Sequence, residues 1–134
     1  MIVQVVPVQH LHQLWSQVSG YLAGALKYAD GDYSLDQVKV FLSTGQWQLL
    51  IFSDETKIYG AVTVSYANYP NDRIAFITAI GGKGISDKDS YQSFCDTLKA
   101  HGATKIQGAA RESVARLWRR LGFKNKHIIV EKTI

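Results

Sequence analysis

The chain has 134 residues, 46% hydrophobic and 19% charged, with a net charge of +4, which excludes a disordered chain and predicts one folded domain over residues 1–134. Its single cysteine, Cys95, excludes an internal disulfide framework, and no apolar run reaches the roughly 20 residues that cross a bilayer. Since the N-terminus carries no secretory signal, we expect a cytoplasmic protein with no membrane partner.

The first elements in the chain are a strand and a helical segment. Residues 2–6 form a short apolar run, which predicts a buried strand. Apolar residues then recur at helical spacing over 11–26. Gly20 and Gly24 interrupt this pattern, so the segment predicts either one weakened helix or two short ones.

A second helix and a hairpin follow. Ser34 and Gln37 have the spacing of a capping box, which predicts a helix start, and Gly45 ends the apolar pattern that follows. The segments 47–52 and 57–66 read as strands on either side of a polar turn. Together they predict a β-hairpin.

The second half of the chain alternates strands and helices. We expect strands over 73–80 and 104–109 with a helix over 87–101 between them, then a helix that Gly122 ends, and a closing strand over 127–133. A strand–helix–strand crossover places its two strands side by side. The order predicts an α/β (α+β) fold, with a mixed, mostly antiparallel central sheet flanked by about four helices.

The segment before the helix over 87–101 is rich in glycine. Glycines let the backbone approach a ligand closely, and a helix N-terminus, capped here by Ser86 or Asp87, stabilises a phosphate. A strand-to-helix turn also needs glycine for its own geometry, so the pattern alone leaves both interpretations open. The candidate ligand residues are Ala79, Ile80, Gly81, Gly82, Lys83 and Gly84.

The last helix is amphipathic and basic. Its apolar face holds four residues, Val114, Leu117, Trp118 and Leu121. Basic residues surround it, namely Arg111, Arg116, Arg119, Arg120, Lys124 and Lys126. They suit a solvated face, the phosphates of a ligand or an acidic protein. No aromatic residues at stacking spacing accompany them, so we disfavour nucleic acid as a partner.

The helix ending Leu-Gly-Phe, the Gly82-Lys83-Gly84 run and the element order resemble the GCN5-related N-acetyltransferase (GNAT) family over essentially the full chain. That resemblance implies an acyl-CoA-binding fold whose Gln/Arg-x-x-Gly-x-Gly/Ala loop binds the pyrophosphate of acetyl-CoA. Ala79 stands where the family has Gln or Arg. In the last helix, Arg111 replaces the family's asparagine and Trp118 its tyrosine. The cofactor-binding candidates therefore include Arg111 and Trp118.

Catalytic residues are harder to assign. The tyrosine at the position of Trp118 often serves the family as general acid, whereas an indole N–H is no usable proton source at neutral pH. The strand over 73–80 carries no carboxylate or histidine, although Asp72 precedes it. Three tyrosines remain as candidate acids, although their spacing does not favour any of them, namely Tyr59, Tyr66 and Tyr69. The catalytic residues stay unknown.

Other reactive residues predict no further site. His10 and His12 point apart on a helix, so we expect no metal, and Cys95 reads as a buried structural thiol. The leading hypothesis is an acetyl-CoA-dependent N-acetyltransferase whose catalytic positions are degenerate and whose acceptor is an amine. The alternative is an inactive, phage-like member of the fold with protein partners or self-assembly, in a virion, its internal core or the host cytoplasm.

Overall fold

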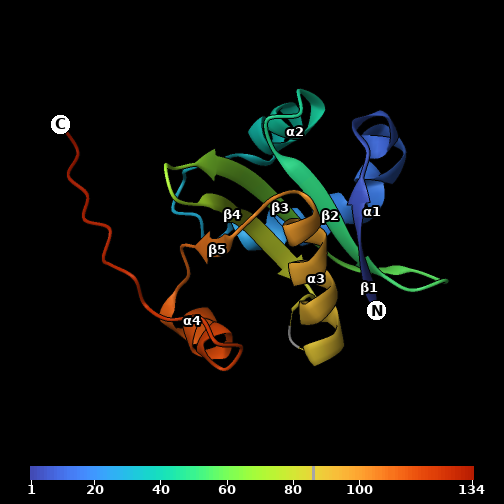
Figure 1. Ribbon diagram of the computed structural model, residues 1–134. Coiled ribbons are helices and arrows are strands. Elements are labelled where there is room, and N and C mark those ends of the chain that lie inside the picture. The colour runs from blue at the N-terminus through green and yellow to red at the C-terminus, as the bar shows by residue number, and fades with distance from the viewer. Residues whose placement is uncertain (86) are drawn as a thin grey trace.

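The computed structural model describes residues 1–85 and 87–134, so the alternative cap Ser86 lies outside the described residues. A five-stranded sheet forms its centre, with strands in chain order across the sheet (Figure 1). Neighbouring strands are antiparallel from β1 to β4, and β5 runs parallel to β4. The strands are β1 (Ile2–Val6), β2 (Gln48–Ser53), β3 (Ile58–Asn68), β4 (Arg73–Gly82) and β5 (Lys105–Gly108).

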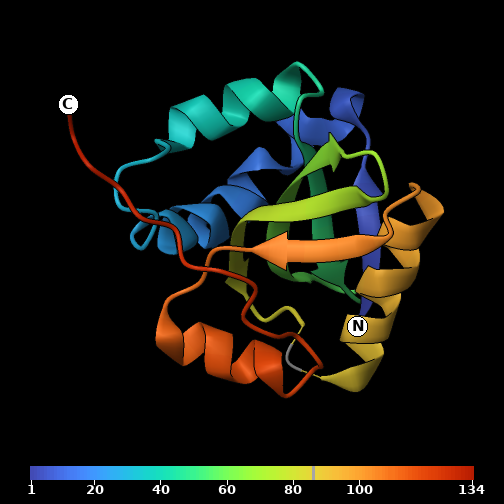
Figure 2. The ribbon, with the colours of Figure 1, turned by 60° about the vertical axis from the view of Figure 1, so that its left-hand side comes forward.

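Four α-helices cover the two faces of this sheet, which confirms the predicted fold class. Their bounds are α1 (Leu11–Leu26), α2 (Leu35–Ser43), α3 (Lys88–Ala100) and α4 (Glu112–Arg119), and a single 3-10 turn, Val8–His10, precedes α1. Buried residues of α1 and α2 pack on one face of the sheet, and those of α3 and α4 on the other (Figures 1 and 2). The predicted crossover is confirmed, because α3 links two adjacent parallel strands.

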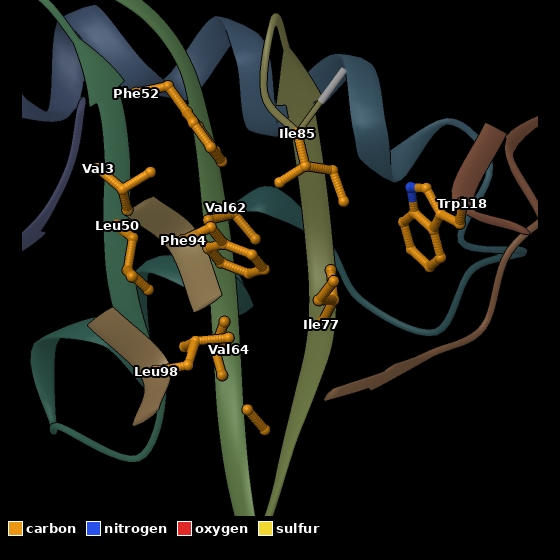
Figure 3. Close-up of a cluster of buried hydrophobic side chains, with 11 residues drawn as sticks. Val3, Leu50, Phe52, Val62, Val64, Ile77, Ile85, Phe94, Leu98 and Trp118 are labelled. Atoms are coloured by element: carbon orange, nitrogen blue, oxygen red, sulfur yellow. The ribbon is translucent and has the colours of Figure 1, made fainter. Parts of the chain in front are cut away.

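The core on the α3 side is built from alternate residues of the strands. Phe94 and Leu98 are each at most 1% exposed and lie over Val62 and Val64 of β3 (Figure 3). Trp118 joins the same cluster from α4. Because the helices contribute their apolar stripes and the strands every second residue, each face of the sheet is closed by one hydrophobic layer.

Two helix starts were readable from local sequence. In α2, Ser34 Oγ accepts from the backbone N–H of Gln37 and Gln37 Oε1 accepts from Ser34 N–H, which confirms the capping box. In α3, Asp87 is the cap, since its carboxylate accepts from both the backbone N–H and the hydroxyl of Ser90. The segment 11–26 forms one continuous helix, so Gly20 and Gly24 do not break it.

The expected closing strand over 127–133 is wrong, because no residue after Arg119 belongs to a strand or helix. β-Branched residues favour a strand only beside a partner edge, and no described strand pairs with this segment. It extends away from the body of the molecule instead (Figure 1). Leu117 was expected on the apolar face of α4, but its side chain is 53% exposed, while Trp118 of the same helix is buried.

Candidate functional site

A cleft opens where β4 and β5 separate. The two strands pair only as far as Ile77 and Gly108; β4 then continues to Gly82 beside β3, while the chain turns away from β5 toward α4. The second half of β4, the C-terminal half of α1 and the start of α4 enclose a volume of about 390 Å³. Beyond Ile77, the β4 edge facing away from β3 has no strand partner among the described residues, so its backbone groups are open to the cleft.

A β-bulge lies at the point of separation. Thr63 of β3 pairs with Ala79 and Val64 with Ile77, which leaves Thr78 as the extra residue of β4. A bulge leaves backbone groups outside the ladder and redirects the neighbouring side chains. Thr78 lines the cleft as a result.

The bulge brings two hydroxyl groups together. Thr78 Oγ1 donates to the backbone carbonyl of Thr63 at 3.0 Å and lies 2.7 Å from Thr63 Oγ1. Since the proton of Thr78 is used in that bond, the fully buried Thr63 hydroxyl is the donor between them. One lone pair of Thr78 Oγ1 remains to accept from a ligand. Sequence reasoning missed this pair, whose signal is a threonine inside each of two apolar strands.

Most of the glycine-rich candidates line the cleft, but as part of a strand. Ala79, Ile80, Gly81 and Gly82 lie in β4, which runs two residues beyond its expected end at residue 80. The expected loop is therefore shorter than predicted. Lys83 and Gly84 follow the strand and do not line the cleft.

Close packing explains two of these glycines. A Cβ on Gly81 would lie 2.0 Å from the backbone oxygen of Tyr21 in α1. Gly82 has φ +74°, and its Cβ would lie 2.5 Å from the oxygen of Tyr59. Both positions require glycine for the approach of β4 to α1 and β3, whether or not a ligand binds.

The helix cap at the start of α3 is acidic, which disfavours binding of a phosphate at the site predicted there. The carboxylate of Asp87 already accepts from the first turn of α3, which also carries Asp89. These hydrogen bonds to Ser90 hold the pKa of Asp87 below its usual range, so the group is an anion at neutral pH. In the loop before it, the N–H of Lys83 donates to the oxygen of Tyr59. The predicted cradle of free N–H groups is thus partly used by the fold.

Arg111 and Trp118, the two candidates from the last helix, reach the same cleft. Arg111 is the residue before α4, and its guanidinium carbon lies 3.7 Å from the ring centroid of Tyr28, just beyond α1. Trp118 is 8% exposed, and its ring packs so closely on Gly108 that a Cβ there would lie 2.8 Å away. The cleft therefore gathers six of the eight predicted ligand residues.

The described lining of the cleft offers no carboxylate or imidazole as a general base. Among the described residues that line it there is no aspartate, glutamate, histidine or cysteine. Two tyrosines line it: the hydroxyl of Tyr21 donates to the carbonyl of Ile58 at 2.9 Å, and the ring of Tyr28 lies against the guanidinium of Arg111. The three tyrosines considered as acids, Tyr59, Tyr66 and Tyr69, do not line the cleft.

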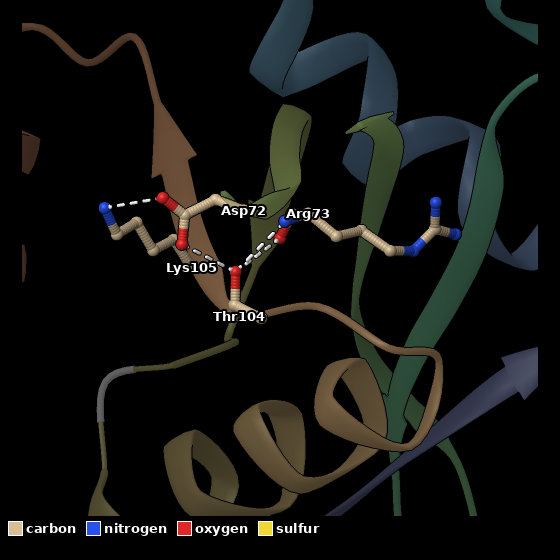
Figure 4. Close-up of polar contacts among 4 residues, drawn as sticks. All are labelled: Asp72, Arg73, Thr104 and Lys105. Carbon is tan, nitrogen blue, oxygen red and sulfur yellow. Dashed lines mark hydrogen bonds and ion pairs between the residues drawn. The ribbon is translucent and has the colours of Figure 1, made fainter. Parts of the chain in front are cut away.

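Asp72 has a structural environment. Its carboxylate lies 3.0 Å from Lys105 Nζ and accepts from the Thr104 hydroxyl, which itself accepts from the N–H of Arg73 (Figure 4). Lys105 first and Thr104 second lower the pKa of Asp72. The network joins the start of β5 to the start of β4, at the end of the strand pair opposite the cleft.

The remaining reactive residues form no second catalytic centre in the described chain. Cys95 is half-buried, and desolvation raises its pKa, which suits an unreactive thiol. No three described His, Cys, Asp or Glu side chains gather as metal ligands. Across the same residues, every helix is too short or too polar to pass through a membrane.

No family model and no curated protein matches this sequence. Solved structures do match over nearly the full chain. A ribosomal-protein-alanine N-acetyltransferase from Brucella melitensis aligns over 100% of both chains with a TM-score of 0.69 at 12% identity. An aminoglycoside acetyltransferase from an uncultured soil metagenomic sample, in complex with sisomicin, aligns over 98% of this chain and 95% of its own, with a TM-score of 0.68 at 11% identity.

A predicted acetyltransferase from Clostridium acetobutylicum, solved with acetyl-CoA, aligns over 98% of this chain and 94% of its own. Its TM-score is 0.60 at 13% identity. At such identities the likeness is one of fold, and the chain has the GNAT fold.

Proposed function

We propose that this protein binds an acyl-CoA in the cleft between β4 and β5 and transfers the acetyl group to an amine. The observation that carries the proposal is the bulge at Thr78, placed where β4 leaves β5 and opens its backbone edge to the cleft. The GNAT fold supports it, since structural neighbours of this chain include acetyltransferases. The proposal concerns reaction class alone, because fold does not decide the acceptor.

The cleft fits the apolar and amide part of such a ligand. Its walls are side chains of α1 and α4, chiefly Tyr21 and Trp118, and its floor is the open edge of β4. An extended amide chain can pair with that edge as a strand would. Arg111 at the end of the cleft supplies positive charge for a phosphate group. With Asp87 capping α3, we assign the phosphate contact to Arg111 rather than to the helix N-terminus.

Chemistry in this cleft rests on position and on hydrogen bonds. Bound acetyl-CoA would supply a thioester: its acetyl C–S bond would break as the C–N bond to the amine forms, and the thiol of coenzyme A would leave with the proton that the nitrogen loses. Backbone N–H groups on the open edge of β4 stabilise negative charge on a carbonyl oxygen. The free lone pair of Thr78 Oγ1 accepts from an amine N–H and orients its nitrogen. Because the described lining has no carboxylate or imidazole to take a proton, the amine enters deprotonated, and turnover is expected to rise with pH up to the pKa of the acceptor itself.

Calorimetric titration with acetyl-CoA tests the proposal. We expect binding to the wild type and roughly tenfold weaker binding to Arg111→Ala, since a charge-assisted contact is lost. Arg120→Ala is the matched control, because Arg120 is an exposed residue of the same type outside the cleft lining. Thiol release in the presence of small amines then tests transfer. An absence of binding at millimolar acetyl-CoA would remove both the ligand and the reaction.

A second function, an inactive GNAT-fold protein that serves in a virion or another assembly, is favoured by a specific observation. The described lining of the cleft offers neither a carboxylate nor an imidazole, and Trp118 stands in place of the expected acid. Binding of acetyl-CoA with no release of the coenzyme A thiol in the presence of any amine tested would support this second function over the first.

A further inference from the structure

The segment 127–133, here called the C-terminal segment, carries an apolar run that the rest of the described chain leaves exposed. Ile128, Ile129 and Val130 are 86%, 75% and 87% exposed. Three consecutive β-branched residues have a strong preference for a strand within a sheet. An exposed apolar patch of this kind in a folded protein marks an interaction surface.

β5 presents the complementary feature. This short strand pairs with β4 along one edge, and along the other edge no described strand pairs with it. A groove of about 840 Å³ lies there, bounded by α3, β5 and residues 122–126. Its apolar lining includes Leu98, Ile106 and Phe123. An open edge beside an apolar groove is the surface to which another strand adds.

The path of the chain directs the C-terminal segment away from its own β5. Phe123 is fixed by packing on Trp118 and Tyr91, and Asn125 accepts from the guanidinium of Arg119. The segment begins directly after Lys126, the last residue of the groove lining. From there it extends outward, beyond the sheet and the helices (Figure 1). Its own groove is left open, so the segment is placed to reach a second molecule.

We propose that two copies of this chain exchange their C-terminal segments, each pairing as a strand with the free edge of β5 in the other copy. The exchange is reciprocal, so one two-fold axis covers the free β5 edge of both copies and uses both C-terminal segments. Seven residues in a strand reach about 23 Å, which is enough to span β5 and its flanking residues. In that strand Ile128 and Val130 share one face, and Ile129 lies on the other.

Light scattering on the eluting full-length protein tests the association. We expect a mass of twice 14.9 kDa for the wild type. The double variant Ile128→Glu with Val130→Glu places two charges on one face of the strand, and we expect the dissociation constant to rise by about 100-fold or more. The matched control is Val8→Glu with Val40→Glu, at two valines that are 50% and 58% exposed elsewhere. It should remain a dimer.

Amide hydrogen exchange identifies the strand that is formed. We expect exchange in residues 128–132 and in β5 to slow together as protein concentration rises through the dimerisation range. Slow exchange in a monomer would mean that the segment pairs within its own chain, and this would overturn the proposal. A monomer at millimolar concentration, or a dimer that the Ile128→Glu, Val130→Glu variant leaves intact, would overturn it as well. Acetyl-CoA affinity is a separate readout, since the cleft does not include this groove.

Discussion

Thr78 shapes the site through one hydroxyl group that has two partners. It donates to the carbonyl of Thr63 and accepts from the Thr63 hydroxyl, which is fully buried. A buried hydroxyl that loses its hydrogen-bond partner destabilises the fold, because the free-energy cost of removing it from water is no longer offset. The pair is therefore a structural unit as well as a candidate orienting group for an amine.

Thr78→Val removes the central hydroxyl of this pair. We expect the free energy of unfolding to fall by about 1–3 kcal/mol, because Thr63 Oγ1 and the Thr63 carbonyl are left without that partner. Thr63→Val combined with Thr78→Val removes both hydroxyls and should recover part of the loss. Urea denaturation of both variants measures the effect. A single variant as stable as the wild type would contradict the assigned hydrogen bonds.

Gly81 was predicted from the sequence as a ligand-binding glycine, whereas the structure shows that close packing on α1 requires a glycine there. Gly81→Ala would set a Cβ 2.0 Å from the backbone oxygen of Tyr21. We expect a loss of about 1–3 kcal/mol in the free energy of unfolding, because backbone cannot yield as a side chain does. Thermal denaturation gives the comparison.

Gly20→Ala is the matched control for that substitution. Nothing lies within 4 Å of a Cβ at Gly20, which is in the interior of α1. We expect it to gain about 0.5–1 kcal/mol, since alanine is the better helix residue. Equal stability of the two variants would show that β4 does not pack on α1 as described.

Among the elements, α3 begins with a charged cap and α2 with a neutral one. Hydrogen bonds from the backbone N–H and hydroxyl of Ser90 lower the pKa of Asp87 in the folded state. Because this pKa is lower in the folded state, the ionised carboxylate stabilises the fold at pH values above the unfolded-state pKa, which is about 3.9. That stabilisation is lost as the pH falls through the folded-state pKa. The Asp87 cap should weaken in acid, whereas the cap of Ser34 should not.

Asp87→Ala and Ser34→Ala form a matched pair for this difference. At pH 7 each is expected to cost about 0.5–2 kcal/mol, the usual value of an N-cap. In strong acid the deficit of Asp87→Ala should shrink while that of Ser34→Ala stays constant. Urea denaturation at the two pH values measures it, and a deficit for Asp87→Ala that does not change with pH would contradict the assignment.

The elements that the sequence predicted correctly are those determined by neighbours in the chain. Caps at Ser34 and Asp87, the hairpin of β2 and β3, and the crossover through α3 all follow from local patterns. The closing strand over 127–133 failed because a strand depends on a partner edge that local sequence does not contain. Thr78 was missed for a similar reason, since a bulge is a property of two strands in register.

In the whole molecule, the cleft lies between the two helical layers. Its wall on one side is α1, which packs with α2, and on the other α4, which belongs to the cluster of α3. A ligand in this position touches both layers and the sheet between them. Its binding should therefore stabilise the fold globally rather than one element.

Acetyl-CoA at 100 times its dissociation constant is expected to add about 2.7 kcal/mol to stability and to raise the Tm by roughly 10 °C. Scanning calorimetry measures the shift. Hydrogen exchange in the bound state should slow in both α1 and α4. Protection confined to one of the two helices would mean that the ligand binds outside the cleft.

Trp118 also makes the cleft visible by optical means. The chain has three tryptophans: Trp15 in α1 and Trp47 before β2 are half-buried in the cluster that α1 and α2 share, whereas Trp118 lies in the cleft wall. With those two replaced by phenylalanine, Trp118 becomes a single intrinsic fluorophore. Its emission wavelength and quenching would then report occupancy of the cleft, so unlabelled compounds could be screened in a plate reader before any acceptor is known.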